Sequence, residues 1–412
     1  MLRKLKQLDF AVMLVLLCLM AFSLTSIYSV TAGRPKTDHY SVRMAVYYVI
    51  GFAGFLATSL VNYKLLIKYA LYVYIFGLML LLFVLFAGNE YYGARGWLTL
   101  PGGLSLQPAE LFKLFLVIFL SSLLLRKNRD RSRGLYFWRD VVPMGLLTFV
   151  PLMLVMAQND LGNALCYLLI LVGLLWIGGI RYVHALIGFA VAFAAIFGGI
   201  QAYIHYHDEA AKLFKSIGRE HWIARFDPWL VPDKASRDDS WQTYNAKLAI
   251  GSGGLDGKGY MQGTTIQSDG RVPLAFADSI FVQIAEEYGF IGSSALLLLY
   301  FILIHRMILI AADCRDRAGP YLITGIITMF IYQIFVNIGA FIGLMPLTGI
   351  TLPFISYGGT SLVINMVSIG VVMSVRIHGQ EEEELLPLQN EPAPATGTGK
   401  ILRLIRDGFN RN

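Results

Sequence analysis

Ten long apolar stretches, each near the length of a membrane-spanning helix, divide this sequence. A helix needs about 20 apolar residues to cross the hydrocarbon core of a bilayer. The stretches lie at residues 10–30, 44–62, 67–87, 109–125, 141–157, 161–178, 183–201, 281–304, 321–345 and 357–375. Charged residues make up only 15% of the chain, against about 25% in soluble domains. We predict an all-α polytopic membrane protein with about ten transmembrane helices, and nine or eleven spans remain alternatives.

Lysine and arginine residues gather in every second connection. They precede the first span and follow the second, fourth, eighth and tenth spans. Short basic loops face the cytoplasm, so both termini are predicted to be cytoplasmic, although Arg34, Lys36 and Arg43 in the first outer connection fit less well. The outer connections of interest are then residues 88–108, 158–160, 201–280 and 346–356.

Two domains are expected from this pattern. Residues 1–376 form the transmembrane domain with a large extracytoplasmic loop at about 201–280, and residues 377–412 form a cytoplasmic tail. The tail combines an acidic run with a segment rich in Pro, Gly and Thr, which predicts disorder. Residues 400–409 place apolar side chains on one helical side, so an amphipathic helix on the inner leaflet and a frayed end are both consistent.

The net charge and the three cysteines argue against some classes of function. A formal charge of +7 fits positive loops on anionic lipid better than nucleic-acid binding, because no basic stripe alternates with exposed aromatic residues. The three cysteines give neither a disulfide framework nor a metal-binding spacing. His205 and His207 are spaced like metal ligands, but the sequence fixes no third ligand.

Asp278 is the main candidate for a functional residue. It lies in RVPLAFADSIFVQIAEEYGF, where the long polar segment enters the eighth apolar stretch. An ionisable side chain at the mouth of a membrane helix is costly and therefore a functional candidate. The alternative is that Asp278 caps a helix that begins at Ser279 or Ile280, and the two roles are compatible.

The second outer connection carries a cluster of charged residues. In GARGWLTLPGGLSLQPAELFKL, Pro108 suits the first turn of a helix that places Glu110 and Lys113 at i and i+3. Together with Arg95 and Trp97 just before them, these residues would form a good binding site for phosphate oxygens. The alternative is an interfacial tryptophan together with an ion pair that bridges helices.

Two further outer connections hold candidate residues. Asp160 or Asn159 in QNDLGNAL is expected to cap the sixth span, and the alternative for Asp160 is a pair with Arg95 or Lys113. The stretch NIGAFIGLMPLTGITLPFISYGGTSL is dense in Gly and Pro at membrane depth, where irregular backbone is tolerated next to a cavity or inside protein. We therefore predict a cavity wall with Ser356 and Thr360 as polar lining, and simple helix kinks are the alternative.

The long loop contains two patterns of its own. IGSGGLDGKGYMQGT resembles a phosphate-binding loop but fails its spacing, since Gly259 rather than Ser or Thr follows Lys258. Glycine turns that pack the loop onto the membrane surface are expected instead. Residues 241–249 (WQTYNAKLA) are predicted to form a short amphipathic helix at the interface.

Five motifs in this order resemble the SEDS family (shape, elongation, division and sporulation; RodA/FtsW/SpoVE). They are GxRxWL…QPAELFKL, QNDLG, AIGSGGLDGKG, FADSIFVQIAEEYGFIG and GLMPLTGITLPFISYGGTSL. The resemblance implies a ten-span peptidoglycan glycosyltransferase that polymerises lipid II at the outer face of the bacterial cytoplasmic membrane. It also implies a partner, a class B penicillin-binding protein whose transmembrane helix packs on the eighth and ninth spans.

The resemblance carries over to particular residues. Asp278 matches the essential acidic residue of the family, and Trp97, Glu110 and Lys113 match the motif of its second outer loop. Gly358 and Gly359, with Ser356 and Tyr357 before them, match the signature that precedes the last span. The chain departs from the family where Phe276 and Ala277 replace the usual polar neighbours of the acid, which is expected to raise the pKa of Asp278 by desolvation.

The expected mechanism joins these residues in one site. Asp278 accepts the proton of a sugar hydroxyl, while Arg95, Lys113 and a divalent cation such as Mg²⁺ or Mn²⁺ are candidates to hold the donor pyrophosphate. The polyprenyl tails are expected in an apolar groove lined by the ninth and tenth spans. The rival hypotheses are a lipid II flippase, whose site would lie near the bilayer midplane, and a scaffold without catalysis.

Overall fold

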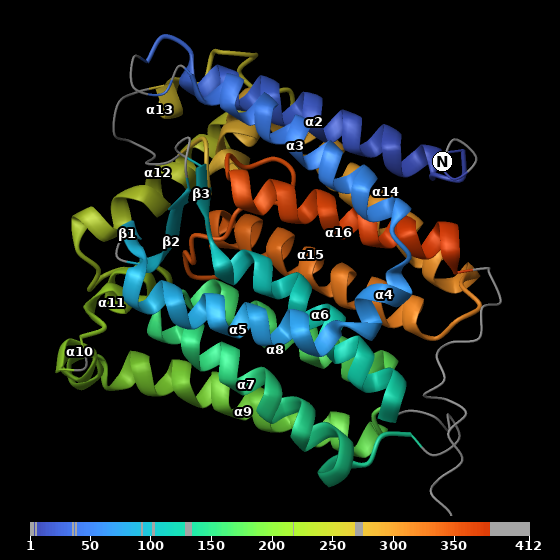
Figure 1. Ribbon diagram of the computed structural model, residues 1–412. Coiled ribbons are helices and arrows are strands. Elements are labelled where there is room, and N and C mark those ends of the chain that lie inside the picture. Colours follow the sequence, from blue (N-terminus) through green and yellow to red (C-terminus); the bar gives the residue numbers. More distant parts are fainter. Residues whose placement is uncertain are drawn as a thin grey trace, which may run out of the picture. The chain divides into compact units, whose positions relative to one another are not determined.

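The computed structural model describes residues 4, 6–34, 37, 39–91, 94–100, 104–127, 134–216, 218–267 and 275–379 (Figure 1). Ten long helices in this part of the chain correspond to the ten predicted spans. They are α2 (Phe10–Thr31), α3 (Tyr40–Leu60), α5 (Ala70–Ala87), α6 (Pro108–Lys127), α7 (Val142–Ala157), α8 (Leu161–Ile177), α9 (Tyr182–His205), α14 (Ile280–Asp313), α15 (Ala318–Ile342) and α16 (Gly359–His378).

The lengths of these helices suit a membrane. Among the described residues, nine helical segments are long and apolar enough to cross a bilayer, if α7 is counted with the π-helical turn η1 (Phe137–Val141) before it. The tenth, α8, is an apolar helix of 17 residues. The prediction of an all-α polytopic membrane protein with about ten transmembrane helices is therefore confirmed.

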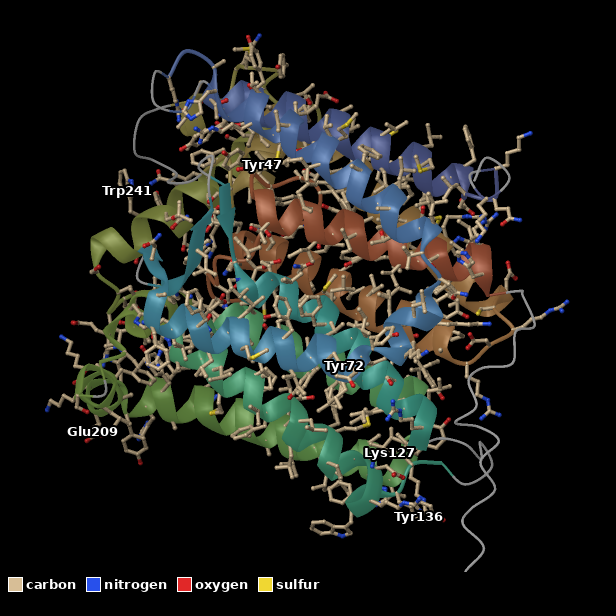
Figure 2. All side chains as sticks on the ribbon, viewed as in Figure 1. Tyr47, Tyr72, Lys127, Tyr136, Glu209 and Trp241 are labelled. Atoms are coloured by element: carbon tan, nitrogen blue, oxygen red, sulfur yellow. The ribbon has the colours of Figure 1, made fainter. Side chains whose placement is uncertain are left out.

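Shorter elements connect the spans at the two ends of the helical bundle. They are α4 (Tyr63–Lys68), β1 (Asn89–Tyr91), β2 (Ala94–Leu100), β3 (Leu104–Leu106), α10 (His207–Ser216), α11 (Glu220–Leu230), α12 (Arg237–Gly253) and α13 (Thr264–Gln267). The strands and α10–α13 gather at one end, and α4 lies at the opposite end (Figure 1). Figure 2 places Glu209 and Trp241 at the first end and Lys127 at the second. The described parts of the predicted outer connections therefore share one end, opposite the basic last turn of α6.

The strands form a small antiparallel sheet in the order β1-β2-β3. Glu90 of β1 pairs with Arg95 of β2, and Leu98 of β2 pairs with Leu106 of β3. The sheet leads directly into α6, whose first residue is Pro108, as predicted. The sequence analysis did not predict strands in this connection.

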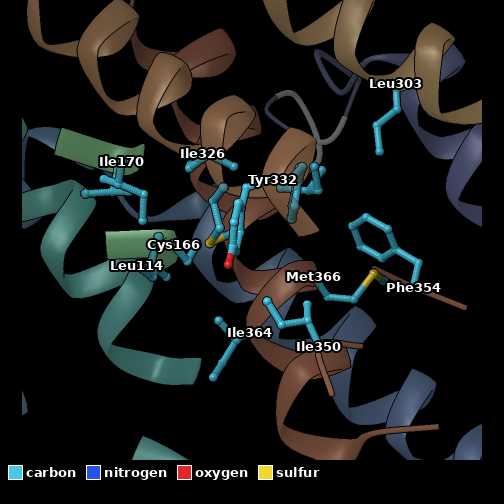
Figure 3. Close-up of a cluster of buried hydrophobic side chains, with 14 of the residues drawn as sticks. Leu114, Cys166, Ile170, Leu303, Ile326, Tyr332, Ile350, Phe354, Ile364 and Met366 are labelled. Carbon is cyan, nitrogen blue, oxygen red and sulfur yellow. The ribbon is translucent and has the colours of Figure 1, made fainter. Parts of the chain in front are cut away.

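The core lies where α6, α8, α15 and α16 meet. Figure 3 shows Leu114, Cys166, Tyr332 and Ile364 from these four helices among the buried side chains. Small residues allow close approach, as is common between membrane helices. A Cβ atom on Gly325, for example, would lie 2.6 Å from the Val117 side chain.

The glycine-rich segment of the long loop packs against a kink in α14. Gly289 interrupts α14 with φ 64° and ψ −158°. The backbone N–H of Lys258 donates to Glu286 O, and that of Phe290 donates to Gly254 O, each at 3.0 Å. The Nζ of Lys258 lies 2.6 Å from Oε1 of the buried Glu286. The predicted glycine turns are confirmed, but their predicted packing on the membrane surface is wrong, because they pack on α14.

The helix predicted at 241–249 is longer in the structure. It is α12, which spans 17 residues and packs against α14. Ala246 and Ala249 are buried, whereas Trp241 and Tyr244 are exposed. The long outer loop is thus a set of helices fixed to the bundle, and the predicted tail helix at 400–409 lies outside the described residues.

Candidate active site at the outer helix ends

Asp278 lies two residues before the first turn of α14 and is partly buried. The N-cap of α14 is Ser279, and its side chain makes no capping hydrogen bond. Ser279 Oγ instead donates to Oδ1 of Asp278 at 3.4 Å and accepts from Gln242 Nε2 at 3.2 Å. The alternative role of Asp278, a cap on this helix, is therefore wrong.

The backbone on either side of this carboxylate is held by distant elements. Asn337 Nδ2, on α15, donates to Asp278 O at 2.8 Å and to Ile350 O at 2.7 Å. The backbone N–H of Tyr357 donates to Phe276 O at 2.9 Å. The Pro- and Gly-rich segment before α16 thus fixes the position of Asp278.

Aromatic rings replace polar groups beside Asp278. The Phe276 ring lies 5.0 Å from the ring of Tyr40 and 5.8 Å from that of Tyr357, centroid to centroid. Burial raises the pKa of Asp278 to about 6, although hydrogen bonds to the carboxylate and the charge of Arg225 lower it in part. The expected direction of the shift is confirmed, so the group is ionised at neutral pH and still a competent proton acceptor.

Asp160 caps α8, which confirms one of its two predicted roles. Its Oδ1 accepts from the backbone N–H of Asn163 at 3.0 Å, and its Oδ2 accepts from Gln107 Nε2 at 2.9 Å. The backbone N–H of Gln107 in turn donates to Thr360 Oγ1 at 3.3 Å. Asp160, the end of the sheet and the start of α16 therefore form one connected rim.

Glu110 and Lys113 form the predicted pair, with 2.7 Å between Oε2 and Nζ. Both side chains are buried within the bundle. A buried charge without a partner is strongly destabilising, so each side chain of this pair compensates the charge of the other. Its predicted contact with phosphate stays a prediction.

The remaining predicted residues lie around this rim. Arg95 and Trp97 are on β2, and the side chain of Arg95 lies outside the described part of the structure. Ser356 is buried, and its Oγ accepts from the backbone N–H of Leu352 at 2.8 Å, so it braces the segment before α16. Gly359 lies against Tyr47, where a Cβ atom would be 2.5 Å from the ring, and Gly358 is the N-cap of α16. Their substrate contacts remain untested.

The structure adds Arg225, which the sequence analysis missed. It lies on α11, and its Nη1 donates to Thr348 O at 3.5 Å. Burial lowers the pKa of Arg225, while the charges of Asp160 and Asp278 raise it. The hydrogen bond to Thr348 places this guanidinium beside the segment that Asn337 joins to Asp278, and the charges of both carboxylates act on it. Nothing in the spacing of the long loop marks Arg225.

The predicted histidine pair has a different environment from a metal site. His207 Nε2 lies 3.0 Å from Oδ1 of Asp227, and its Nδ1 lies 3.1 Å from Oδ1 of Asp208. No group of three or more His, Cys, Asp or Glu side chains arranged for a metal ion occurs within the described residues. A divalent cation at the Asp278 site stays a prediction.

An apolar groove runs along the bundle between α14 and α15. It has a volume of about 340 Å³, and Tyr300, Phe301 and Phe335 are among its lining residues. The groove therefore lies between the eighth and ninth spans. The expected place of the polyprenyl tails between the ninth and tenth spans stays a prediction. The tenth span, α16, is mostly buried against α3 and other helices, so it has little surface left to line a groove.

Ten apolar helices with a charged rim at one end define a multi-pass membrane protein, and comparison with known proteins gives the family. A family model described as cell cycle protein (FtsW/RodA/SpoVE) matches residues 6–381. The peptidoglycan glycosyltransferase MrdB of Escherichia coli K12 is 34% identical over 318 residues, which cover 75% of this chain and 78% of that protein. A probable peptidoglycan glycosyltransferase FtsW of Geobacter sp. strain M18 is 32% identical over 381 residues, 90% of this chain and 98% of that protein.

The fold agrees with these sequence relatives. A chain of a solved peptidoglycan synthase complex that coordinates polymerization and crosslinking superposes with a TM-score of 0.72 and 26% identity. The match covers 91% of this chain and 99% of that chain. The protein therefore belongs to the FtsW/RodA/SpoVE family, the SEDS family that its motifs resemble.

Proposed function

We propose that this protein is a peptidoglycan glycosyltransferase that polymerises lipid II, with Asp278 as the general base. The environment of the Asp278 carboxylate is the main support for its role as the base. It is partly exposed at the outer helix ends, its pKa is raised to about 6, and Arg225 lies close to it. A base with a pKa near the working pH is the efficient choice for taking a proton from a hydroxyl.

The reaction joins two lipid-linked saccharides. The 4-hydroxyl of the acceptor sugar attacks the anomeric carbon of the donor, and the bond to the polyprenyl pyrophosphate breaks. The hydroxyl proton passes to Asp278, and the pyrophosphate leaves with the bonding electrons. Positive charge near this leaving group stabilises the transition state, and Arg95 and Lys113 remain the candidates from the sequence.

Orientation and partner belong to the same proposal. The outer helix ends face away from the cytoplasm, where the basic loops lie and both termini are expected. The transmembrane helix of a class B penicillin-binding protein is expected to pack on α14 and α15. The apolar groove between these helices supports that position, because apolar helices without a covering partner lie along it.

Purified protein in nanodiscs with fluorescent lipid II tests the proposal. Wild type should produce glycan ladders, and Asp278→Asn should retain folding and insertion while its rate falls by about 10²–10⁴-fold, the usual contribution of a general base. Asp256→Asn is the matched control, since Asp256 is an exposed carboxylate of the same long loop.

Two results would contradict different parts of the proposal. Ladders from Asp278→Asn at the wild-type rate exclude this residue as the base. Movement of intact lipid II across the membrane without any polymer favours the flippase instead. The clustering of the polar candidates at the helix ends, rather than at the bilayer midplane, supports the enzyme over the transporter.

A further inference from the structure

Arg225 has hydrogen-bonding capacity that the protein itself does not use. Arginine carries five N–H donors, and among the described residues the only hydrogen-bond acceptor for Arg225 is Thr348 O, at a long 3.5 Å. No carboxylate in the described part of the chain lies within the 4.0 Å of an ion pair with it. Partly buried donors are normally satisfied, so this guanidinium is prepared for a ligand.

His221 lies one helical turn before Arg225 and on the same face of α11. Residues at i and i+4 are neighbours on a helix surface. Among the described residues, Nε2 of His221 is buried and has no hydrogen-bond partner. Burial, followed by the charges of Arg225 and Arg219, lowers the pKa of His221, so its ring is neutral at pH 7 and able to donate one hydrogen bond.

The rest of α11 holds this face in place. Arg219 donates to Asn159 Oδ1 in the turn between α7 and α8 and lies 5.5 Å from the centre of the Trp222 ring. The Trp222 ring contacts Phe226 and Phe214. Arg219 and the aromatic side chains are therefore committed to the fold, which leaves His221 and Arg225 on the face of α11 that carries the hydrogen bond to Thr348.

We propose that Arg225, with His221 beside it, binds the pyrophosphate of the lipid-linked donor substrate. The proposal rests on the proposed function and adds Arg225 to the two cations, Arg95 and Lys113, that the sequence offered for the leaving group. Lys113 is fully buried and paired with Glu110, whereas Arg225 has free donors and lies near Asp278. A polyprenyl pyrophosphate places its charged group at the membrane rim, level with the helix ends that carry Asp160 and Asp278.

Two anions of the substrate can in principle meet this guanidinium, the pyrophosphate and the carboxylates of the stem peptide. Arginine binds both in a bidentate manner. Pyrophosphate is favoured because Arg225 lies near the proposed base, and the leaving group must be within a few atoms of the hydroxyl that the base activates. The experiment therefore uses inorganic pyrophosphate and free stem pentapeptide as separate probes.

The test compares Arg225→Gln with wild type in nanodiscs. Inorganic pyrophosphate should bind wild type saturably in microscale thermophoresis and inhibit lipid II polymerisation. Arg225→Gln should weaken this binding by about 10–100-fold, the usual loss for a hydrogen bond to a charged group, and raise KM for lipid II. Arg225→Lys should recover part of the affinity, because it keeps the charge but not the fork of donors.

Lys215→Gln is the matched control, since Lys215 is an exposed cation of the same outer segment, paired at 3.2 Å with exposed Glu220. It should leave pyrophosphate binding unchanged. Absence of saturable pyrophosphate binding to wild type, or equal binding by wild type and Arg225→Gln, overturns the inference. Competition by pentapeptide rather than pyrophosphate overturns it in favour of the stem peptide.

These failures are distinct from failure of the proposed function. If wild type forms glycan ladders and Asp278→Asn does not, while Arg225→Gln keeps wild-type KM and pyrophosphate inhibition, the enzyme assignment stands and the inference falls. If wild type forms no ladders, the proposed function falls whatever the binding data show. If Arg225→Gln fails to fold, its loss of binding says nothing about the guanidinium. The binding of pyrophosphate to Arg225→Lys and to wild type then tests the inference.

Discussion

The carboxylate of Asp278 combines two properties that oppose each other. Its apolar neighbours make it a stronger base, because burial raises its pKa from 3.8 to about 6. The same burial makes the ionised form costly for the folded protein at neutral pH. A residue of this kind is expected to reduce stability in return for reactivity.

Asp278→Asn should therefore make the protein more stable at neutral pH while it removes activity. Between pH 3.8 and 6 the folded state holds the Asp278 proton more tightly than the unfolded chain does, so the free energy of unfolding falls as pH rises through this window. Removing the carboxylate should raise the free energy of unfolding at pH 7.5 by on the order of 1–3 kcal/mol.

Denaturation of both proteins at pH 7.5 and at pH 3.5 measures this effect. At pH 3.5 the carboxyl is largely protonated in both states, so the two proteins should differ little. A variant less stable than wild type at pH 7.5, or a gap that is the same at both pH values, would contradict the strain assigned to this carboxylate.

The residues of the site that lie in or next to the first turn of a helix could be predicted from the sequence. Asp160 and the Glu110–Lys113 pair could be read from their spacing, since caps and i, i+3 pairs depend on nearby positions in the sequence. Arg225 could not, because its neighbours Thr348, Asp160 and Asp278 come from distant segments. The failure of Asp278 to cap α14 has a similar cause, since Asn337 holds its backbone carbonyl and Gln242 holds the neighbouring Ser279 through tertiary contacts.

The kink in α14 joins the reactive end of this helix to the long loop. Gly289 has a positive φ that L side chains adopt rarely, and it lies against the turn at Gly257. The hydrogen bonds at this kink fix the glycine-rich segment, which follows α12 directly. Because Gln242 of α12 contacts Ser279, the kink helps to set the surroundings of Asp278.

Gly289→Ala should disrupt this junction. A Cβ atom at Gly289 would lie 2.3 Å from the backbone N of Gly257, and the φ of 64° adds strain. We expect a loss of at least about 2–4 kcal/mol in the free energy of unfolding, from overpacking against backbone together with strain, and a lower polymerisation rate. Thermal denaturation and the lipid II assay check both effects.

Gly251→Ala is the control for that experiment. Gly251 lies within α12, and a Cβ atom there would meet nothing within 4 Å. Alanine should stabilise this helix by about 0.5–1 kcal/mol. Equal stabilities of the Gly289→Ala and Gly251→Ala proteins would show that the kink is dispensable.

Helices were easier to predict than the elements between them. Long apolar runs leave few options in a bilayer, whereas β1–β3 are short strands that depend on pairing across a turn. The length of α12 was underestimated because its first residues are polar, and its packing on α14 rather than its own pattern stabilises it. Tertiary contacts of this kind leave little trace in local sequence.

The arrangement of the whole bundle explains why the site forms at one end. Alternating apolar spans bring the connections 88–108, 158–160, 201–280 and 346–356 to the same end, and each contributes at least one residue to the rim around Asp278. Apolar runs and basic loops predicted this convergence. The groove between α14 and α15 was not predicted, because hydropathy does not tell which apolar face lacks a neighbour.

The dependence of kcat/KM for lipid II on pH tests the role of this rim and its carboxylate together. For wild type, kcat/KM should rise about tenfold per pH unit below pH 6 and level off near pH 7, because the free enzyme must have Asp278 ionised to accept the proton. A profile that is flat from pH 5 to 7, or one with the same inflection in the residual activity of Asp278→Asn, would contradict the assignment of Asp278 as the base.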